Sequence, residues 1–191
     1  MFSPLIERAL RVAADAHRHQ HRKASDIPYL THPVSVMLIL QRAGFHDEEL
    51  LAAAALHDVV EDTSRSLADL AADFPPRVLE FVACLTERKR DPAGQPRSWH
   101  DRKREHIEQV AASPWEARAI VLADKLHNLA TIAFDLDAGQ NVWPRFNAPA
   151  RQLLDYHRTM VDRAEQGDPR LASLAIECRR LIEQLEHAIE S

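Results

Sequence analysis

One segment constrains the fold of this chain more than any other: residues 47 to 62, DEELLAAAALHDVVED. It is apolar on nearly every side from Leu50 to Val60, and a helix that is apolar all round is normally buried in the middle of a domain. We therefore predict a central helix over residues 47–61.

The inner end of this predicted helix is polar. On a continuous helix His57 lies one turn from Glu61, and Asp58 lies one turn from Asp62. Buried ionisable groups must be paired, neutralised or bound to a metal. Three carboxylates crowded beside one another favour a cation.

A second predicted helix, residues 114–137, carries a similar polar feature. Asp124, Asn128 and Thr131 form a polar stripe beside a wall of apolar residues. Taken alone, Asp124 is equally well interpreted as a cap or as a buried salt-bridge partner. Combined with the polar end of the central helix, it becomes a candidate metal ligand.

His32, in Thr31-His32-Pro33, adds a second imidazole. Two imidazoles and two carboxylates can hold one divalent ion and still leave positions for water and a substrate phosphate, which is typical of a hydrolase. The candidate ligands are His32, His57, Asp58 and Asp124.

The order and surroundings of these residues resemble a known family, the HD-domain phosphohydrolases. The closest likeness is to the (p)ppGpp hydrolase domain of RelA/SpoT-type enzymes and their small stand-alone relatives. It rests on residues 16–33 (AHRHQHRKASDIPYLTHP), 55–63 (ALHDVVEDT) and 122–129 (LADKLHNL). The resemblance implies that the four candidate ligands bind a metal, usually Mn²⁺. It also implies that Glu61 and Asp62 are the catalytic acid/base pair and that Arg22, Lys23 and Asn128 bind the nucleotide.

Each implied role has a simpler alternative. Glu61 and Asp62 are placed to orient a water and take its proton, but they equally suit the solvated acidic end of a helix. Arg22 and Lys23 are expected just after the first helix, where the helix dipole favours basic residues. Their functional interpretation is that one or both grip a pyrophosphate.

Charge is distributed unevenly along the chain. The total of −5, from 24 basic and 29 acidic residues, argues against general nucleic-acid binding. Residues 88–104 hold seven basic and two acidic residues, a net +5 against −10 for the rest. This strip either attracts a multiphosphate or is a solvated, mobile loop. Trp99 and Trp143 either stack on a base or pack against neighbours.

The remaining sequence predicts an all-α fold, a single HD-type helical bundle of about eight or nine helices. Four glycines and almost no β-branched alternation leave little room for a sheet. We expect one domain over 1–191, with a motif-bearing core at about 1–137 and covering helices at about 148–190. The predicted helices span 3–21, 32–43, 47–61, 66–73, 75–87, 98–112, 114–137, 148–166 and 169–190.

Length and composition limit the remaining possibilities. At 191 residues the chain is too short to hold both the hydrolase domain and a nucleotidyl-transferring domain. We therefore expect it to degrade (p)ppGpp and not to make it. Cys84 and Cys178 are interpreted as reduced core thiols of a cytoplasmic protein. We expect no signal peptide and no membrane span. His127 is interpreted as a packing or surface residue.

Three function classes remain open at this point. The favoured class is a metal-dependent pyrophosphohydrolase that takes a small nucleotide and removes the 3′-pyrophosphate of (p)ppGpp or a close analogue, giving GDP or GTP and pyrophosphate. The second is a phosphohydrolase of another small nucleotide, such as a nucleoside monophosphate, a deoxynucleotide or NADPH. The third is a non-catalytic nucleotide sensor.

Overall fold

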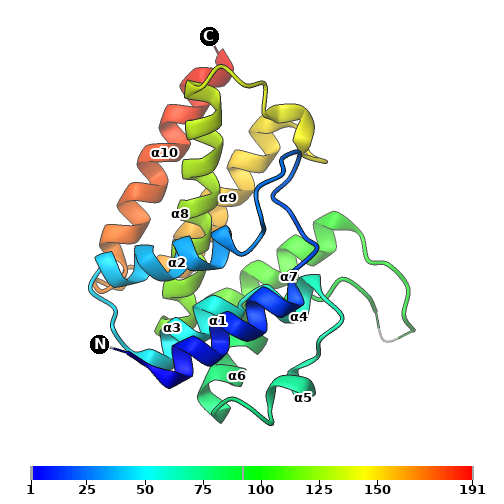
Figure 1. Cartoon of the computed structure of the whole chain (residues 1–191). Helices are drawn as coiled ribbons and strands as arrows, with labels where there is room; N and C mark the ends of the chain where they lie inside the picture. The colour runs from blue at the N-terminus through cyan, green and yellow to red at the C-terminus, as the bar shows by residue number, and fades with distance from the viewer. Residues whose placement is uncertain (1, 92, 191) are drawn as a thin grey trace.

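The computed structural model describes residues 2–91 and 93–190, and its regular structure is helical (Figure 1). Within these ranges there is no β-strand, only the isolated bridges His21–Pro28 and Arg90–Pro96. The all-α prediction is confirmed. The helices are α1 (Pro4–Ala16), α2 (Thr31–Arg42), α3 (Glu48–Leu56), α4 (Val59–Asp62), α5 (Leu67–Leu70), α6 (Pro76–Leu85), α7 (Trp99–Ala111), α8 (Trp115–Asp137), the 3₁₀ turn η1 (Trp143–Arg145), α9 (Ala150–Glu165) and α10 (Ala172–Glu190).

Helix α3 is buried among other helices, as its apolar sequence predicts. Asp47 caps its N-terminus by accepting the backbone N–H groups of Glu49 and Leu50, each at 2.9 Å. Every residue from Leu50 to Leu56 is buried. The helix packs against α1, α2, α6 and α8, so the residues that follow Leu56 emerge among four other helices.

The prediction of one continuous helix over 47–61 is wrong at His57 and Asp58. Helix α3 ends at Leu56, and the short helix α4 begins at Val59. The His57 ring Nδ1 lies 2.8 Å from the Ala54 carbonyl oxygen, the group that accepts the N–H of Asp58 in a continuous helix. The side chain thus competes with the helical ladder where the chain changes direction.

The first helix is also shorter than predicted, ending at Ala16 and not at residue 21. Beyond it a loop folds back on itself: the Tyr29 N–H donates to the Gln20 carbonyl and the Arg22 N–H to the Ile27 carbonyl, each at 2.9 Å. Ala24, at the turn of this loop, has a left-handed φ of 53°. Arg22 and Lys23 therefore project from a loop and do not occupy a helix C-terminus.

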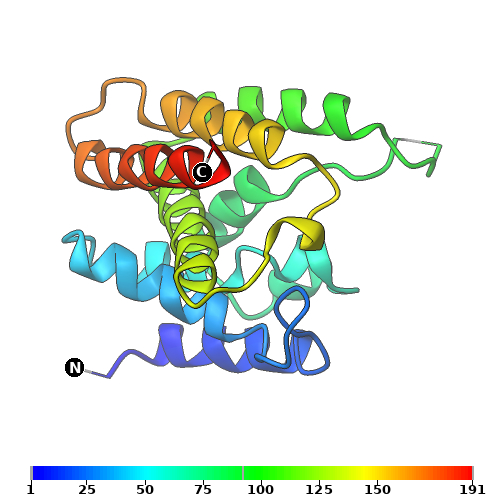
Figure 2. The same ribbon diagram turned by 90° about the horizontal axis from the view of Figure 1, so that it is seen from above.

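The long helix α8 crosses the middle of the structure (Figure 2). It packs against α2 on one side and against α9 and α10 on the other. The other predicted helices end within a few residues of the observed ones, apart from the second half of 66–73, which is a turn after Leu70. The turn η1 was not predicted. No helix of the described residues has the length and apolar character needed to cross a membrane.

Candidate metal and catalytic site

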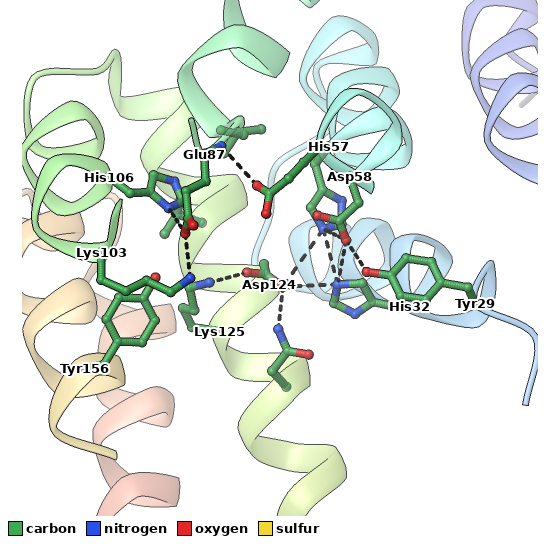
Figure 3. Close-up of a pocket in the computed structure, with 14 residues that line it drawn as sticks. Tyr29, His32, His57, Asp58, Glu87, Lys103, His106, Asp124, Lys125 and Tyr156 are labelled. Carbon is green, nitrogen blue, oxygen red and sulfur yellow. Dashed lines mark hydrogen bonds and ion pairs between the residues drawn. The ribbon is translucent and has the colours of Figure 1, made fainter. Parts of the chain in front are cut away.

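Four predicted ligands from three separate parts of the chain converge in one cavity of about 150 Å³. His32 comes from the start of α2, His57 and Asp58 from the break between α3 and α4, and Asp124 from the middle of α8. Figure 3 shows their side chains pointing toward one another. Both imidazoles are buried, with His32 1% and His57 4% exposed.

The spacing of the donor atoms fits a single ion. His32 Nε2 lies 3.2 Å from His57 Nε2, 3.1 Å from Asp124 Oδ1 and 3.5 Å from Asp58 Oδ2. His57 Nε2 lies 3.0 Å from Asp58 Oδ2 and 3.9 Å from Asp124 Oδ1. Ligand atoms about 2.1 Å from a common ion lie about 3 Å apart when adjacent. Nitrogen and oxygen donors in this number suit a divalent transition ion.

The hydrogen bond at the far side of the His57 ring fixes its tautomer. A carbonyl only accepts, so Nδ1 must donate to Ala54 and Nε2 is left to face the other ligands. Burial alone would lower the pKa of His57, but Asp58 and Asp124 raise it to about 9. The same ion pair holds the pKa of Asp58 below its usual range against burial. Without a cation, a proton on His57 balances the carboxylates.

His127 supports His32 in a comparable way, which makes its interpretation as a packing or surface residue wrong. Its Nδ1 lies 2.7 Å from Nδ1 of His32. Burial and the neighbouring His32 lower the pKa of His127 to about 4, so the ring is neutral at pH 7. When His32 Nε2 faces an ion, its Nδ1 carries the proton and His127 accepts it in a hydrogen bond.

The carboxylates of the candidate ligands Asp58 and Asp124 also accept hydrogen bonds from neighbouring side chains. Tyr29 donates its hydroxyl to Asp58 Oδ2 at 2.6 Å. Asn128 Nδ2 donates to Asp124 Oδ1 at 2.6 Å, and Lys125 Nζ donates to Asp124 Oδ2 at 2.7 Å. Burial would raise the pKa of Asp124, but Lys125 and His32 hold it well below its usual range. Asp124 is therefore ionised and ready to bind a cation.

Glu61 and Asp62 lie beside the ligands but in different surroundings. Glu61 lines the cavity; Oε2 accepts the backbone N–H of Glu87 at 3.0 Å, and Oε1 lies 3.3 Å from Lys89 Nζ. Asp62 is not part of the cavity lining and is paired with Lys89 at 2.5 Å. Burial raises the pKa of Glu61, partly offset by the Glu87 N–H and by Lys89. A raised carboxyl pKa suits proton transfer near neutral pH.

The three predicted nucleotide-binding residues differ in how close they lie to the cavity. Asn128 lines the cavity, and its Oδ1 accepts a hydrogen bond from Arg22 Nη2 at 2.9 Å. The Arg22 guanidinium lies 5.7 Å from the Tyr29 ring centre, and Lys23 Nζ lies 5.3 Å from that of Phe146. Neither Arg22 nor Lys23 lines the cavity itself.

Several basic residues of segment 88–104 are paired with carboxylates. Lys89 pairs with Glu61 and Asp62, while Arg102 and Lys103 pair with the buried Glu87 at 2.7 and 2.5 Å. Trp99 begins α7 and packs edge-on against Tyr156, with ring centres 6.1 Å apart. Part of this segment therefore forms one wall of the site.

Sequence reasoning missed several residues around the cavity, and most had a detectable signal. Lys125 adjoins Asp124, and His127 lies three residues from it on the same face of α8. Tyr29 stands three residues before His32. By contrast, Tyr156 comes from α9, outside every motif, and nothing in the sequence pairs it with the other cavity residues.

Comparison with known proteins identifies the family. The HD domain matches residues 9–143 of this chain. The chain is a member of the HD-domain family. The His57-Asp58 pair and the two other candidate ligands, His32 and Asp124, all lie within the matched range and line one cavity. An HD domain implies a divalent metal ion, and His32, His57 and Asp124 offer donor atoms that all lie within 4.8 Å of one another, close enough to hold one.

Individual proteins similar to this chain include pyrophosphohydrolases and pyrophosphokinases of guanosine nucleotides. A guanosine-3′,5′-bis(diphosphate) 3′-pyrophosphohydrolase of Drosophila melanogaster is 40% identical over 132 residues, which are 68% of this chain and 70% of that protein. A GTP pyrophosphokinase of Streptomyces coelicolor is 40% identical over 129 residues, but the match spans only 15% of it. A solved structure of a metazoan ortholog of SpoT that hydrolyses ppGpp has a TM-score of 0.77 and 33% identity, covering 96% of this HD-domain chain and 97% of that one.

Proposed function

We propose that this HD-domain protein is a metal-dependent pyrophosphohydrolase that removes the 3′-pyrophosphate from (p)ppGpp or a close analogue, giving GDP or GTP and pyrophosphate. The observation that carries the proposal is the convergence of four ligand atoms and Glu61 in one cavity. The likeness to a ppGpp-hydrolysing ortholog of SpoT over nearly the whole chain supports this substrate class.

In this proposal His32, His57, Asp58 and Asp124 hold one divalent ion, which we take to be Mn²⁺. When bound, such an ion lowers the pKa of a water molecule and offsets the charge of a phosphate. The residues behind the ligands keep them in place: His127 for His32, the Ala54 carbonyl for His57, and Tyr29 for Asp58.

Glu61 is the proposed proton acceptor for the attacking water. It lines the cavity next to the ligands, and its raised pKa brings proton uptake closer to neutral pH. Asp62 is the proposed second acid/base group. Lys89 bridges both carboxylates, so one ammonium limits the repulsion between them and fixes the direction in which each points.

Arg22, Lys23 and Asn128 are proposed to bind the nucleotide. The Arg22–Asn128 hydrogen bond places a guanidinium at the edge of the cavity, where a phosphate or base edge of the substrate would pass. We further propose a cytoplasmic location, which suits a nucleotide substrate and the free thiols Cys84 and Cys178.

One experiment separates this function from hydrolysis of another small nucleotide and from a sensor role. Purified protein with Mn²⁺ is incubated with ppGpp, pppGpp, their adenine analogues, NADPH and nucleoside monophosphates, and the products are identified. We expect pyrophosphate together with GDP or GTP. Release of orthophosphate from the other nucleotides alone would favour the second class, and nucleotide binding without turnover would favour a sensor.

A further inference from the structure

The cavity extends beyond the proposed metal ligands to a second end that the proposed chemistry does not use. This end is lined by Lys103 and His106 of α7, Lys125 of α8 and Tyr156 of α9, with Glu87 behind them (Figure 3). Basic and hydroxyl groups facing a shared cavity are typical of a site for an anion.

Lys125 connects the two ends. Its ammonium lies 2.7 Å from Asp124 Oδ2, while the other oxygen of that carboxylate lies 3.1 Å from His32 Nε2. The side chain is only 12% exposed. One carboxylate therefore separates Lys125 from the ligand cluster, and a phosphate at the ligands has oxygens within reach of this ammonium.

Lys103 of α7 supplies a second cation to this end of the cavity. Its Nζ lies 2.5 Å from Glu87 Oε2, and Arg102 Nη1 lies 2.7 Å from Oε1 of the same carboxylate. The Glu87 side chain is 2% exposed, so two cations share one buried negative charge. The surplus positive charge is costly in a partly buried site unless an anion compensates it.

Tyr156 lies close to both lysines. Its ring centre is 5.0 Å from Lys103 Nζ and 5.8 Å from Lys125 Nζ. Its hydroxyl oxygen is buried and has no hydrogen-bond partner among the described residues, and the same holds for His106 Nε2. Buried tyrosine hydroxyls normally have a partner, so this one points to a ligand or to ordered water.

We propose that Lys125, Tyr156 and Lys103 form a subsite for the terminal phosphate of a pyrophosphate group, whose other phosphate lies at the metal ligands. This inference rests on the proposed function and deepens it. Lys103 Nζ and Lys125 Nζ lie 5.0 and 5.8 Å from the same Tyr156 ring centre, so two cations are available to a second phosphate that is linked to one at the ligands. Arg22 and Lys23, which do not line the cavity, then serve the nucleoside side of the substrate.

The test uses inorganic pyrophosphate as the probe, titrated calorimetrically into the Mn²⁺-loaded protein at a fixed free Mn²⁺ concentration. Tyr156→Phe removes only a hydroxyl that has no hydrogen-bond partner in the part of the chain that the structure describes. Lys103→Gln removes one cation while Arg102 still pairs with Glu87. Arg104→Gln is the matched control, because Arg104 lies on the same helix, is 76% exposed and, within residues 2–91 and 93–190, forms its ion pair with Asp101.

We expect Tyr156→Phe and Lys103→Gln each to weaken pyrophosphate binding about 10- to 100-fold, with Mn²⁺ affinity and melting temperature kept, and Arg104→Gln to behave as wild type. Unchanged pyrophosphate affinity in both variants would overturn the subsite, as would a wild-type protein that does not bind pyrophosphate. An equal loss of Mn²⁺ affinity would also overturn it, because the residues would then only support the fold. Since the probe is pyrophosphate alone, these outcomes do not depend on whether the protein hydrolyses ppGpp.

Discussion

Tyr29→Phe tests how strongly the surroundings of the ligands determine metal affinity. The Tyr29 hydroxyl donates to Asp58 Oδ2 at 2.6 Å, and burial together with Asp58 raises the pKa of Tyr29, so this donor keeps its proton at working pH. Phenylalanine retains the ring contacts with His17 and His32, whose centres lie 4.7 and 5.8 Å away. The variant thus removes the short hydrogen bond to Asp58 and a longer contact of the same hydroxyl with Asp62 Oδ2 at 3.5 Å.

The expected loss of metal affinity follows from the shorter bond, because Asp58 is a proposed metal ligand. A hydrogen bond to a charged group contributes about 1.5–3 kcal/mol, which corresponds to about a 10- to 100-fold weaker metal affinity, the usual effect of losing a group that orients a ligand. The dissociation constant for Mn²⁺ is measured by electron paramagnetic resonance of the free ion at constant pH. Turnover at saturating Mn²⁺ should recover most of the wild-type value.

Tyr156→Phe is the matched control for this measurement. It also removes one tyrosine hydroxyl from the same cavity, but one that contacts no proposed ligand. Its Mn²⁺ affinity should equal that of wild type. Wild-type Mn²⁺ affinity in Tyr29→Phe, or the same loss in both variants, would refute the reasoning.

Four further predictions concern catalysis, substrate binding and pH. Glu61→Gln should lower turnover about 10²- to 10⁴-fold while Mn²⁺ stays bound; near-normal turnover would return Glu61 to a solvated helix end. Arg22→Ala should lower kcat/KM for ppGpp by about one to two decades, again with the metal retained, and loss of metal would place Arg22 among the structural supports of the ligands. Because the pKa of His57 is raised to about 9 without metal, Mn²⁺ must displace a proton, and its affinity should rise by about tenfold per pH unit from pH 7 to 9; a flat profile would contradict the His57–Asp58 pair. His157 is buried, and burial together with Lys125 lowers its pKa to about 3. Below about pH 6.5 this residue therefore binds a proton in the unfolded chain but not in the folded one, and the free energy of unfolding should fall by about 1.4 kcal/mol per pH unit as the pH drops. Denaturant titrations at two pH values should show a smaller fall in His157→Leu than in wild type.

The sequence predicts the elements of this fold well because most of them follow one clear pattern. A helical run such as Leu50–Leu56 has no polar face to expose to solvent, so its buried, central position follows directly from the sequence. At His57, where the predicted helix is interrupted, a side chain of the site takes the carbonyl that the backbone ladder would use. Such competition depends on tertiary neighbours and leaves no periodic signal.

In the candidate site, too, some residues could be predicted from the sequence and others could not. His32 and Asp124 are 92 positions apart in the sequence, and their proximity was predicted only through residue type, burial and the family likeness. The partners that hold the ligands, such as Tyr29 and His127, and the residues of the second end, such as Tyr156, depend on how α2, α8 and α9 pack. Helix packing fixes those contacts, and periodicity within one helix does not.

The most direct test of the proposed metal centre is anomalous X-ray diffraction at the manganese edge from crystals grown with Mn²⁺. The structure predicts one strong peak within about 2.5 Å of His32 Nε2, His57 Nε2, Asp58 Oδ2 and Asp124 Oδ1, and no such peak in crystals of Asp58→Ala. A peak elsewhere in the wild-type protein, or full occupancy of this position in Asp58→Ala, would contradict the assignment of these four residues as the metal site.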